Sequence, residues 1–305
     1  MRIAVVGAGA MGSIFAGHLA RAKHDVVLVG RSPAHVEAVA RHGLVLSHGE
    51  AAHRVELSAT VGAGSQAPVE LVVVLTKSAD TAAAATSVHA MCREGTIALS
   101  LQNGIGNMEA IAAALPDSRL VGGVSGVGGR LLSPGRVEMT AATAQGLSRS
   151  WIGPWDGSAS LEVANDVARL LTEAGLPTEV SNDVLPVIWT KLAMASAMNA
   201  VAAVTRLPVD AIMASPTGHG LVAAAIREIV AVARAKGIGL EEAAVLDIAL
   251  RTYAGTGPHL TSMATDIFSA RPTEIGSLCE AVAREGERAG ISTPVNATLA
   301  ALVRT

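Results

Sequence analysis

The 305-residue chain predicts an α/β N-terminal domain followed by an all-α C-terminal domain. Short valine-rich runs, such as D-V-V-L-V-G at 25–30 and E-L-V-V-V-L at 70–75, recur up to about residue 181. Such near-continuous apolar runs are typical of parallel strands that are buried on both faces. From residue 182 onward they stop, and long segments rich in alanine, leucine and valine follow. We therefore expect two domains, at 1–181 and 182–305.

A glycine-rich turn follows the first predicted strand, residues 3–6, and a helical pattern of small residues continues at 13–21. The glycines have the G-x-G-x-x-G spacing, in which the first permits the turn and the second lets the backbone approach a pyrophosphate. The third lets the helix pack on the strand, and the pyrophosphate lies at the helix N-terminus. The alternative is a glycine-rich turn without a ligand. We expect a Rossmann domain that binds a dinucleotide through Gly7, Gly9, Ala10, Met11 and Gly12.

Two basic residues follow predicted strands of this domain. Arg31 comes directly after the run at 25–30, where an NAD-binding domain usually has an acid that holds the ribose 2′-OH. A cation at this position suits a 2′-phosphate, so Arg31 favours NADP. Lys77 follows the run at 70–75, and open α/β sheets bind ligands at this end of their strands. Lys77 is therefore a candidate second cation for the cofactor phosphates, although a solvated side chain is the alternative for both residues.

A polar sequence, Gln102-Asn103-Gly104, follows another apolar run at 96–101. An amide at this edge can form hydrogen bonds with a substrate carbonyl or a cofactor ribose, whereas an asparagine that only turns the chain before a glycine is the alternative. The remaining patterns of this half predict a hairpin of 44–46 with 54–57, an antiparallel end with strands at 137–139 and 151–153, a helix at 161–174 and an edge strand at 178–180.

The helical half is divided by proline and glycine into long segments. We expect helices at 183–203, 215–236, 241–251 and 274–290. Lys191 lies inside the strongly apolar first segment, and Asn199 follows two turns later, about 80° around the helix. A half-buried lysine shifts its pKa readily and can serve as a general acid. The alternative is a lysine that reaches solvent from a surface helix.

A second polar cluster lies at 261–274. Ser262 is able to donate a hydrogen bond to a carboxylate, and Glu274 is expected to open a helix after Pro272. An acid in a first helical turn is also favoured by the helix dipole alone, so the residue type by itself leaves the role of Glu274 open. A Rossmann domain joined to a helical domain predicts an active site in the cleft between them.

The composition argues against several classes of protein. With 23 basic and 26 acidic residues the formal net charge is −3, and no basic stripe indicates a nucleic-acid partner. Cys92 and Cys279 lie far apart and lack neighbours at metal-ligand spacing, so we expect no disulfide framework, no metal and a cytoplasmic location.

The chain starts with a strand, from which we expect no signal peptide. The most apolar run, 192–204, is too short for a membrane span. The sequence does not decide between a monomer and a homodimer, because an alanine-rich helical face can pack within the domain or against a second copy.

Taken together, the motifs resemble those of the ketopantoate reductase (2-dehydropantoate 2-reductase) family over nearly the whole chain. The matching motifs are G-A-G-A-M-G at 7–12, Arg31, T-K at 76–77, Q-N-G-I-G at 102–106, W-T-K-L at 189–192, S-M-A-T-D at 262–266 and T-E-I at 273–275. The resemblance implies a Rossmann domain, a helical domain like the C-terminal domain of 6-phosphogluconate dehydrogenase, and NADPH-dependent reduction of a 2-oxo acid in pantothenate biosynthesis.

The resemblance also implies roles for individual residues. Lys191 would be the general acid that protonates the ketone oxygen, and Glu274 would hold and tune that lysine. Asn103 would contact substrate and cofactor, Asn199 would contact substrate, and Ser262 would bind the substrate carboxylate. A developing alkoxide needs such a proton donor in a site that excludes water.

Three positions depart from the family pattern. Ala195 replaces an asparagine one turn after the lysine, and Gly276 and Cys279 stand where the family often has an acid and an asparagine. Because alanine can neither donate nor accept a hydrogen bond, one substrate contact of the family is missing. The sequence therefore leaves open another 2-oxo or 2-hydroxy acid, and also a regulatory protein that binds NADP without turnover.

Overall fold

The computed structural model describes residues 1–64 and 67–304, and its backbone divides into two compact units. The first, the sheet unit, contains residues 1–102 and 107–184; the second, the helical unit, contains residues 103–106 and 185–305. The predicted boundary at 181/182 did not anticipate that the short segment 103–106 packs with the helices.

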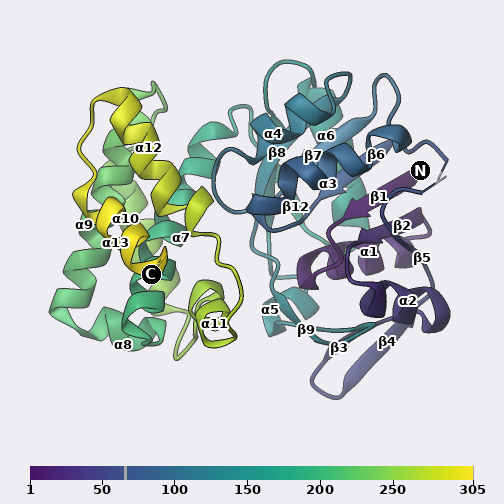
Figure 1. Ribbon diagram of the computed structural model, residues 1–305, viewed down its shortest axis with the longest axis horizontal. Coiled ribbons are helices and arrows are strands. Elements are labelled where there is room, and N and C mark those ends of the chain that lie inside the picture. The colour runs from purple at the N-terminus through teal and green to yellow at the C-terminus, as the bar shows by residue number, and fades with distance from the viewer. Residues whose placement is uncertain (65–66, 305) are drawn as a thin grey trace. The chain divides into compact units, whose positions relative to one another are not determined.

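The sheet unit is built on an eight-stranded sheet (Figure 1). In spatial order its strands are β12 (Thr178–Val180), β11 (Ser150–Pro154), β8 (Arg119–Ser125), β7 (Ile97–Ser100), β6 (Leu71–Val74), β1 (Arg2–Val6), β2 (Asp25–Gly30) and β5 (Ser58–Val61). The strands from β8 to β5 are parallel, and their order is that of a Rossmann fold. As expected, β11 runs antiparallel to β8, and β12 lies at the edge.

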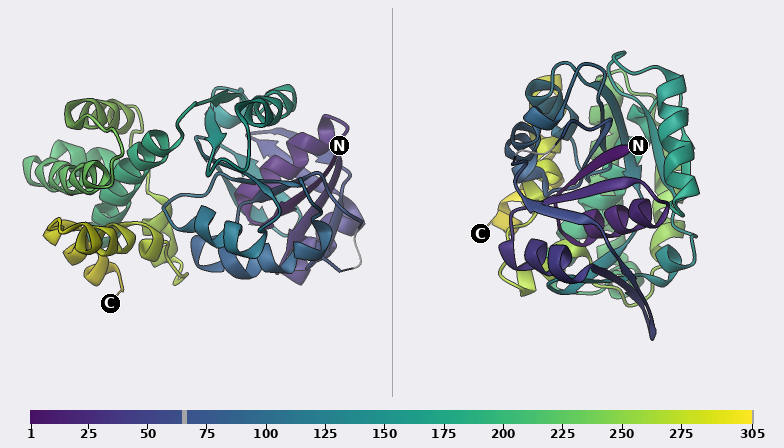
Figure 2. Two further views of the ribbon diagram at one scale, coloured as in Figure 1. Left: turned by 90° about the horizontal axis from the view of Figure 1, so that it is seen from above. Right: turned by 90° about the vertical axis from the view of Figure 1, so that its right-hand side faces the viewer.

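Helices cover both faces of this sheet because successive strand residues point to opposite sides. Ile3 and Val5 of β1 face one core, whereas Ala4 and Val6 face the other. In the left view of Figure 2, the blue helices α3 and α4 lie on one side of the strands and the teal helix α6 on the other. The helices of this unit are α1 (Ala10–Arg21), α2 (Pro33–His42), α3 (Thr81–Ser87), α4 (Asn107–Ala114), α5 (Ala141–Ala144) and α6 (Leu161–Glu173), with the short turns η1 (Ser78–Asp80) and η2 (His89–Met91).

A smaller four-stranded sheet packs beside α1. Its order is β4 (Ala51–Val55), β3 (Leu44–His48), β10 (Arg136–Met139) and β9 (Gly129–Ser133). The predicted hairpin is confirmed as β3 with β4. The strand predicted at 137–139 is β10, which pairs antiparallel with β9 and, unexpectedly, parallel with β3. Leu44, Leu46 and Val137 lie in the same core as Phe15 of α1, and this burial explains the pairing.

The helical unit is organised around α7 (Leu185–Thr205), which packs against α9, α11 and α13 (Figure 1). Its other elements are α8 (Val209–Ala214), α9 (Pro216–Ala235), α10 (Glu242–Ala254), α11 (Ser262–Phe268), η3 (Ile275–Ser277), α12 (Cys279–Ala289) and α13 (Pro294–Arg304). No strand occurs among the described residues after β12. The predicted helices at 183–203, 215–236 and 241–251 match α7, α9 and α10, apart from their ends.

The helix expected at 274–290 begins later than predicted. Glu274 precedes the single 3₁₀ turn η3, and α12 starts only at Cys279. Leu278, between them, has φ −104° and ψ −116°, which lies outside the helical region and breaks the helix. Glu274 therefore lies in a loop that precedes a tight turn and does not open α12.

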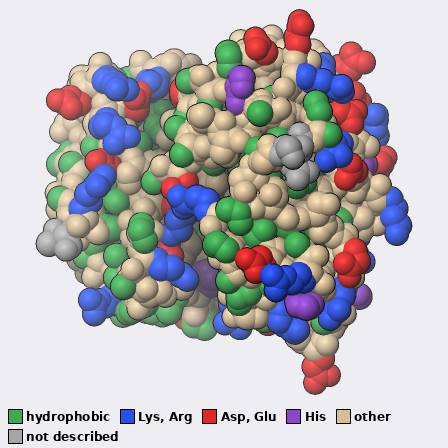
Figure 3. All heavy atoms as spheres, turned by 45° about the vertical axis from the view of Figure 1, so that its right-hand side comes forward, with side chains coloured by type: hydrophobic (Ala, Val, Ile, Leu, Met, Phe, Trp, Pro, Cys, Tyr) green, Lys and Arg blue, Asp and Glu red, His purple; other side chains and the backbone are tan. Residues whose placement is uncertain are grey.

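One described helix, α7, is long and apolar enough to cross a membrane by length and composition. It is longer than the apolar run 192–204, and 61% of its most apolar window is buried inside the protein. A buried core helix passes the same test, and α7 is the core helix of its unit. On the face shown in Figure 3, basic and acidic side chains lie close together in several small groups. Ion pairs between such side chains include Arg130–Glu138 and Arg227–Glu242.

Candidate active site

The glycine-rich turn has the geometry that its spacing predicts. Gly7 has φ +111°, its N–H donates to the Val29 carbonyl over 2.8 Å, and a Cβ there would lie 2.7 Å from the backbone of Leu75. A Cβ at Gly12 would lie 1.9 Å from the Gly7 carbonyl oxygen, so helix and strand touch at this point. A Cβ at Gly9 would meet nothing within 4 Å. The open space at the middle glycine leaves the backbone accessible to a ligand.

The N-terminus of α1 begins at this open space. Gly9 is its N-cap and supplies no capping side chain, and the first turn contains no acid. The N–H groups at the start of a helix have no intrahelical acceptor and favour an anion. Ala10 and Met11 are half-buried against the core of the sheet unit, which fixes this turn in place. The residues present therefore fit the pyrophosphate of a dinucleotide.

Arg31 and Lys77 follow the ends of β2 and β6, next to this turn. Two parallel hydrogen bonds join the Arg31 guanidinium to Asp80, from Nη1 to Oδ1 over 2.8 Å and from Nη2 to Oδ2 over 2.5 Å. Lys77 is half-buried and immediately precedes η1, where its carbonyl accepts the N–H of Asp80 over 2.9 Å. Asp80 is not marked by any sequence motif. Its position three residues after Lys77, at the end of a strand, is the only signal of its proximity to Arg31.

The amide of Gln102 stabilises the sheet unit through hydrogen bonds. Its Nε2 donates to the Thr76 carbonyl and to Thr81 Oγ1, each over 2.8 Å, and its Oε1 accepts from Ser100 Oγ over 2.8 Å. These bonds tie the end of β7 to the end of β6 and to the start of α3. The Gln102 amide is therefore engaged by neighbouring protein groups.

Asn103 begins the segment 103–106, which packs within the helical unit. The Ile105 N–H donates to the Ser277 carbonyl over 3.1 Å, and the Ile105 side chain packs against the helical core. Gly104 has φ +86°, and a Cβ there would lie 2.5 Å from the Ser277 carbonyl oxygen. Ser277 Oγ in turn donates to the Glu274 carbonyl over 3.1 Å. The half-buried Asn103 is therefore attached to the loop that carries Glu274.

Lys191 and Asn199 lie on one face of α7. Between 188 and 203 every residue of this helix is buried except Thr190, Lys191, Met194, Ala195 and Asn199, which are half-buried. Their spacing of three to five residues places them along one stripe. Burial lowers the pKa of the Lys191 ammonium below its ordinary value, because desolvation disfavours the charged form. Among residues 1–64 and 67–304, no hydrogen bond or ion pair engages Lys191 Nζ.

Ser262 is exposed at the first position of α11, a helix whose core residues Met263 and Ala264 pack with Leu192 of α7. Thr261 caps this helix by accepting the Ala264 N–H over 3.3 Å. Glu274 is half-buried in the loop before η3. No hydrogen bond or ion pair joins Glu274 to Lys191 in the described part of the chain, and the role of Glu274 toward the lysine stays a prediction.

The structure thus places the predicted residues in two groups. Gly7, Gly9, Ala10, Met11, Gly12, Arg31 and Lys77 surround the strand ends of the sheet unit, whereas Asn103, Lys191, Asn199, Ser262 and Glu274 belong to the helical unit. The prediction of a cleft between the two domains stays a prediction.

In the described part of the chain, no group of three or more His, Cys, Asp or Glu side chains is arranged to hold a metal ion.

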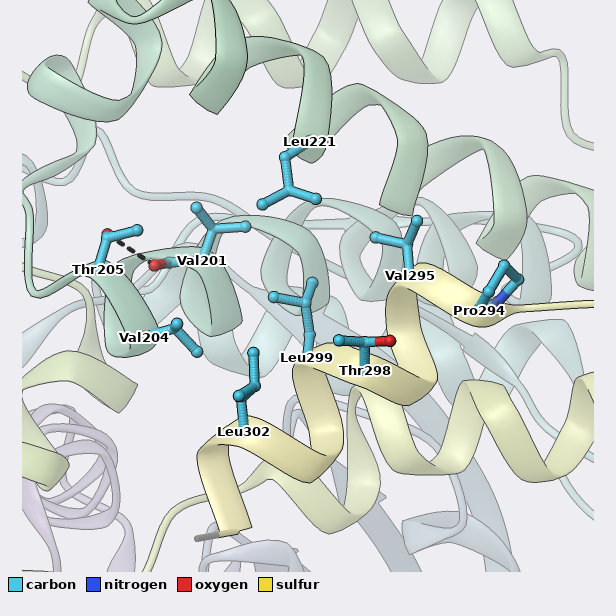
Figure 4. A pocket seen from close by; sticks show the side chains of 9 residues that line it. All are labelled: Val201, Val204, Thr205, Leu221, Pro294, Val295, Thr298, Leu299 and Leu302. Atoms are coloured by element: carbon cyan, nitrogen blue, oxygen red, sulfur yellow. Dashed lines mark hydrogen bonds between the residues drawn. The ribbon is translucent and has the colours of Figure 1, made fainter.

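A separate apolar groove lies within the helical unit, between α7, α9 and α13 (Figure 4). It has a volume of about 320 Å³ and contains none of the predicted site residues. Val201, Leu221 and Leu299 point into it, and the hydroxyl of Thr205 is already donated to the Val201 carbonyl over 2.7 Å. Its lining offers no group with acid–base or nucleophilic chemistry, so we do not assign catalysis to this groove.

Comparison with known proteins follows the same division of the chain. The family profile described as "Ketopantoate reductase PanE/ApbA" matches residues 3–157, and its C-terminal counterpart matches residues 183–305. The 2-dehydropantoate 2-reductase of Halobacterium salinarum is 32% identical over 305 residues, which cover 100% of this chain and 98% of that protein. The enzyme of the same name from Pyrococcus horikoshii is 30% identical over 304 residues, covering 100% and 97%.

Two solved structures show the same fold along the whole chain. The PanE/ApbA family ketopantoate reductase from Ralstonia eutropha has a TM-score of 0.88 and 31% identity, with 100% of this chain and 97% of that chain covered. D-mandelate dehydrogenase in complex with NADH and anilino(oxo)acetate has a TM-score of 0.92 and 25% identity, with coverage of 100% and 97%.

Proposed function

We propose that this chain, which belongs to the ketopantoate reductase family, reduces a 2-oxo acid to a 2-hydroxy acid with NADPH. The family consists of oxidoreductases that act on CH–OH groups with a nicotinamide cofactor. The leading substrate is 2-dehydropantoate, which is converted to pantoate in pantothenate biosynthesis. The observation that carries this proposal is Lys191, a half-buried lysine with a lowered pKa on the open stripe of α7.

The residues of the sheet unit would hold the cofactor. The start of α1 at Gly9–Gly12 suits the pyrophosphate, and Arg31 and Lys77 suit the additional phosphate of NADPH. When bound, the nicotinamide supplies the hydride that reduces C2 of the oxo acid. We propose residues 1–181 as the NADP-binding domain and 182–305 as the substrate and catalytic domain.

The helical unit would supply the proton. As C2 is reduced, negative charge develops on the ketone oxygen, and Lys191 Nζ donates a proton to that oxygen and is later reprotonated from solvent. A lysine whose pKa is lowered by burial is a stronger acid near neutral pH than an exposed lysine. Glu274 would orient the ammonium from the loop before η3, and Ser262 would donate to the substrate carboxylate.

Asn103 and Asn199 would complete the contacts with the substrate. Asn199 lies two turns after Lys191 on the same stripe of α7, and Asn103 is held by the packing of Gly104 and Ile105 on the Ser277 backbone. Asn103 would also contact the cofactor. Both amides can donate to and accept from a bound oxygen, so they can fix its orientation.

The stripe itself favours a second candidate substrate class. Met194 and Ala195 separate Lys191 from Asn199, so the middle of the stripe presents only apolar side chains. A substrate hydroxyl placed there would lose its hydrogen bond to water without replacement. The second candidate is therefore a 2-oxo acid with an apolar branched or aromatic substituent, in line with the similarity to D-mandelate dehydrogenase bound to anilino(oxo)acetate.

A panel of 2-oxo acids tests the proposal. NADPH oxidation would be followed with 2-dehydropantoate, with branched aliphatic 2-oxo acids and with phenylglyoxylate. The highest kcat/KM for 2-dehydropantoate supports the first candidate, and a low rank for it with fast turnover of the apolar acids supports the second. If the protein binds NADPH but no oxo acid accelerates its oxidation, a regulatory NADP-binding function replaces both.

The remaining expectations are proposals of the same kind. We propose a cytoplasmic location and a small-molecule substrate, without a nucleic-acid or membrane partner. The two cysteines, Cys92 and Cys279, are free thiols, and burial raises their pKa values to about 11 and about 12. Thiols of this kind remain protonated and are poor nucleophiles, so neither takes part in the proposed reaction.

A further inference from the structure

The ion pair between Arg31 and Asp80 bears on the choice between the two nicotinamide cofactors. Arg31 is the residue whose charge favours the 2′-phosphate of NADPH, yet both of its terminal nitrogens already donate to one carboxylate. The side chain of Arg31 is 79% exposed and that of Asp80 only 29% exposed, so the acid is the more buried partner. This fork is the arrangement by which arginine binds a phosphate.

We propose that Asp80 is a specificity-determining residue that competes with the 2′-phosphate of NADPH for Arg31, so that NADH is accepted nearly as well as NADPH. This inference rests on the proposed function, because it takes the cofactor ribose to lie beside Arg31. It concerns only the balance between the two cofactors and not the substrate.

Charge explains the competition. The ionisable side chains on the two loops that meet here are Arg31, Lys77 and Asp80, with a net charge of +1. A phosphate monoester brings a charge of about −1.5 to −2 at neutral pH. If it approaches Arg31, it must either displace the Asp80 carboxylate or lie within a few ångströms of it, where like charges repel.

The same carboxylate suits the ribose of NADH. In NAD-binding Rossmann domains an acid after the second strand accepts a hydrogen bond from the ribose 2′-OH. Here Arg31 has that place in the sequence, but Asp80 returns an acid to the same edge from the loop after β6. A neutral hydroxyl can donate to this carboxylate without charge repulsion, and Arg31 then remains paired.

The test compares the dissociation constants of NADPH and NADH for the wild type, Asp80→Asn and Arg31→Ala. Asparagine keeps the size of the side chain and removes its charge. We expect Asp80→Asn to bind NADPH about tenfold more tightly, while NADH binding is unchanged or weakened a few-fold. Arg31→Ala leaves the Asp80 carboxylate unpaired and should therefore weaken NADPH binding more than NADH binding. Asp80→Glu should retain the wild-type balance because it keeps the negative charge.

Asp25→Asn is the matched control. Asp25 also pairs with an arginine, the half-buried Arg2, over 3.0 Å, but Asp25 lies at the opposite end of β2. Over the six residues of this strand the separation from Arg31 is roughly 20 Å, more than the screening length of about 8 Å in physiological salt. This variant removes one negative charge from the same unit and should leave the NADPH-to-NADH ratio unchanged.

The outcomes distinguish the inference from the function on which it rests. If Asp80→Asn binds NADPH more weakly than the wild type, Asp80 positions Arg31 for the phosphate and the inference is overturned. An unchanged ratio in a folded Asp80→Asn variant, checked by its thermal unfolding, overturns it as well. If the wild type binds neither cofactor, the nucleotide part of the proposed function fails together with the inference.

Discussion

The candidate site residues of the sheet unit and those of the helical unit differ in kind. In the sheet unit the features proposed to bind the pyrophosphate are backbone features: the turn at Gly7, the contact of Gly12 with the Gly7 carbonyl and the open N-terminus of α1. In the helical unit the proposed site features are side chains, Lys191 and Asn199, on a helix that is otherwise buried. A backbone site depends on local sequence, whereas a side-chain site depends on the packing of elements that are distant in sequence.

This difference has consequences for mutation. Changes in the turn of the sheet unit should alter cofactor binding or folding, and changes on α7 should alter turnover. The segment 103–106 is the exception, because it follows a strand of the sheet unit yet packs with the helices. The four predictions below test this division, beginning with the largest expected effect.

The largest effect is expected for Lys191→Met. Removal of the proton donor should lower kcat for the oxo acid by about 10³-fold, and NADPH binding should remain within a few-fold of wild type. Because burial of the Lys191 ammonium is unfavourable, the variant should also be more stable by about 1 kcal/mol or more. Steady-state kinetics, cofactor titration and urea unfolding measure the three quantities.

The matched control for this prediction is Lys236→Met. Lys236 belongs to the same unit but forms an exposed ion pair with Glu285. Its replacement should leave kcat unchanged. Full turnover by Lys191→Met would remove the lysine from its role as the general acid.

The middle and the last glycine of the turn, Gly9 and Gly12, provide the second prediction. Gly12→Ala introduces a Cβ 1.9 Å from the Gly7 carbonyl and should destabilise the protein by about 3 kcal/mol. Gly9→Ala meets no protein atom within 4 Å, so it should fold normally but weaken NADPH binding at least tenfold. Thermal unfolding and cofactor titration separate the two effects. Equal losses of stability in both variants would contradict the open space assigned to Gly9.

The third prediction concerns the segment that crosses between the units. Gly104→Ala would place a Cβ 2.5 Å from the Ser277 carbonyl and displace Asn103, which should lower kcat/KM for the oxo acid by about 10²-fold. Gly106→Ala is the control, since Gly106 also has positive φ but meets no atom within 4 Å. A comparable loss in both variants would show that backbone strain alone, and not the Ser277 contact, is responsible.

The smallest effect is an acid sensitivity of the sheet unit. The Gly135 N–H donates to Nδ1 of the buried His35, whose Nε2 lies 3.0 Å from Ser13 Oγ, and desolvation lowers the pKa of His35. Burial also lowers the pKa of His18. Below about pH 6.5 both histidines become protonated in the unfolded chain, whereas burial disfavours their protonation in the folded protein. The free energy of unfolding therefore falls as the pH decreases below that value.

The loss attributable to each histidine should be on the order of 1 kcal/mol per pH unit just below pH 6.5. Urea unfolding between pH 7.5 and pH 5.5 measures it, and His35→Gln should flatten the slope. If this variant keeps the full slope, the acid sensitivity originates elsewhere in the protein.

The sequence predicted those features that depend on neighbouring residues. The glycine spacing determines the turn at Gly7, and the valine-rich run at 70–75 marks a buried strand because it has no polar face. The features that were wrong or unexpected depend on tertiary contacts. The pairing of β10 with β3, the pair of Arg31 with Asp80 and the contact of Ile105 with Ser277 each join residues separated by at least 49 positions.

The late start of α12 is explained by the packing of two side chains in the helical core. The composition after Pro272 favours a helix, but the backbone of Leu278 leaves the helical region so that Leu278 and Ile275 both enter the helical core. Core packing outweighs helix propensity at this point, since propensity differences are below about 1 kcal/mol per residue. Such a break cannot be read from the residue types alone.

The proposed hydride transfer is tested by following the hydrogen from the cofactor to the product. NADPH labelled with deuterium at both C4 positions of the nicotinamide would be incubated with the best oxo acid, and the product analysed by mass spectrometry. We expect one deuterium at C2 of the 2-hydroxy acid for the wild type, and loss of labelled product with Lys191→Met while NADPH remains bound. A 2-hydroxy acid without label, or labelled product formed equally fast by Lys191→Met, would contradict it.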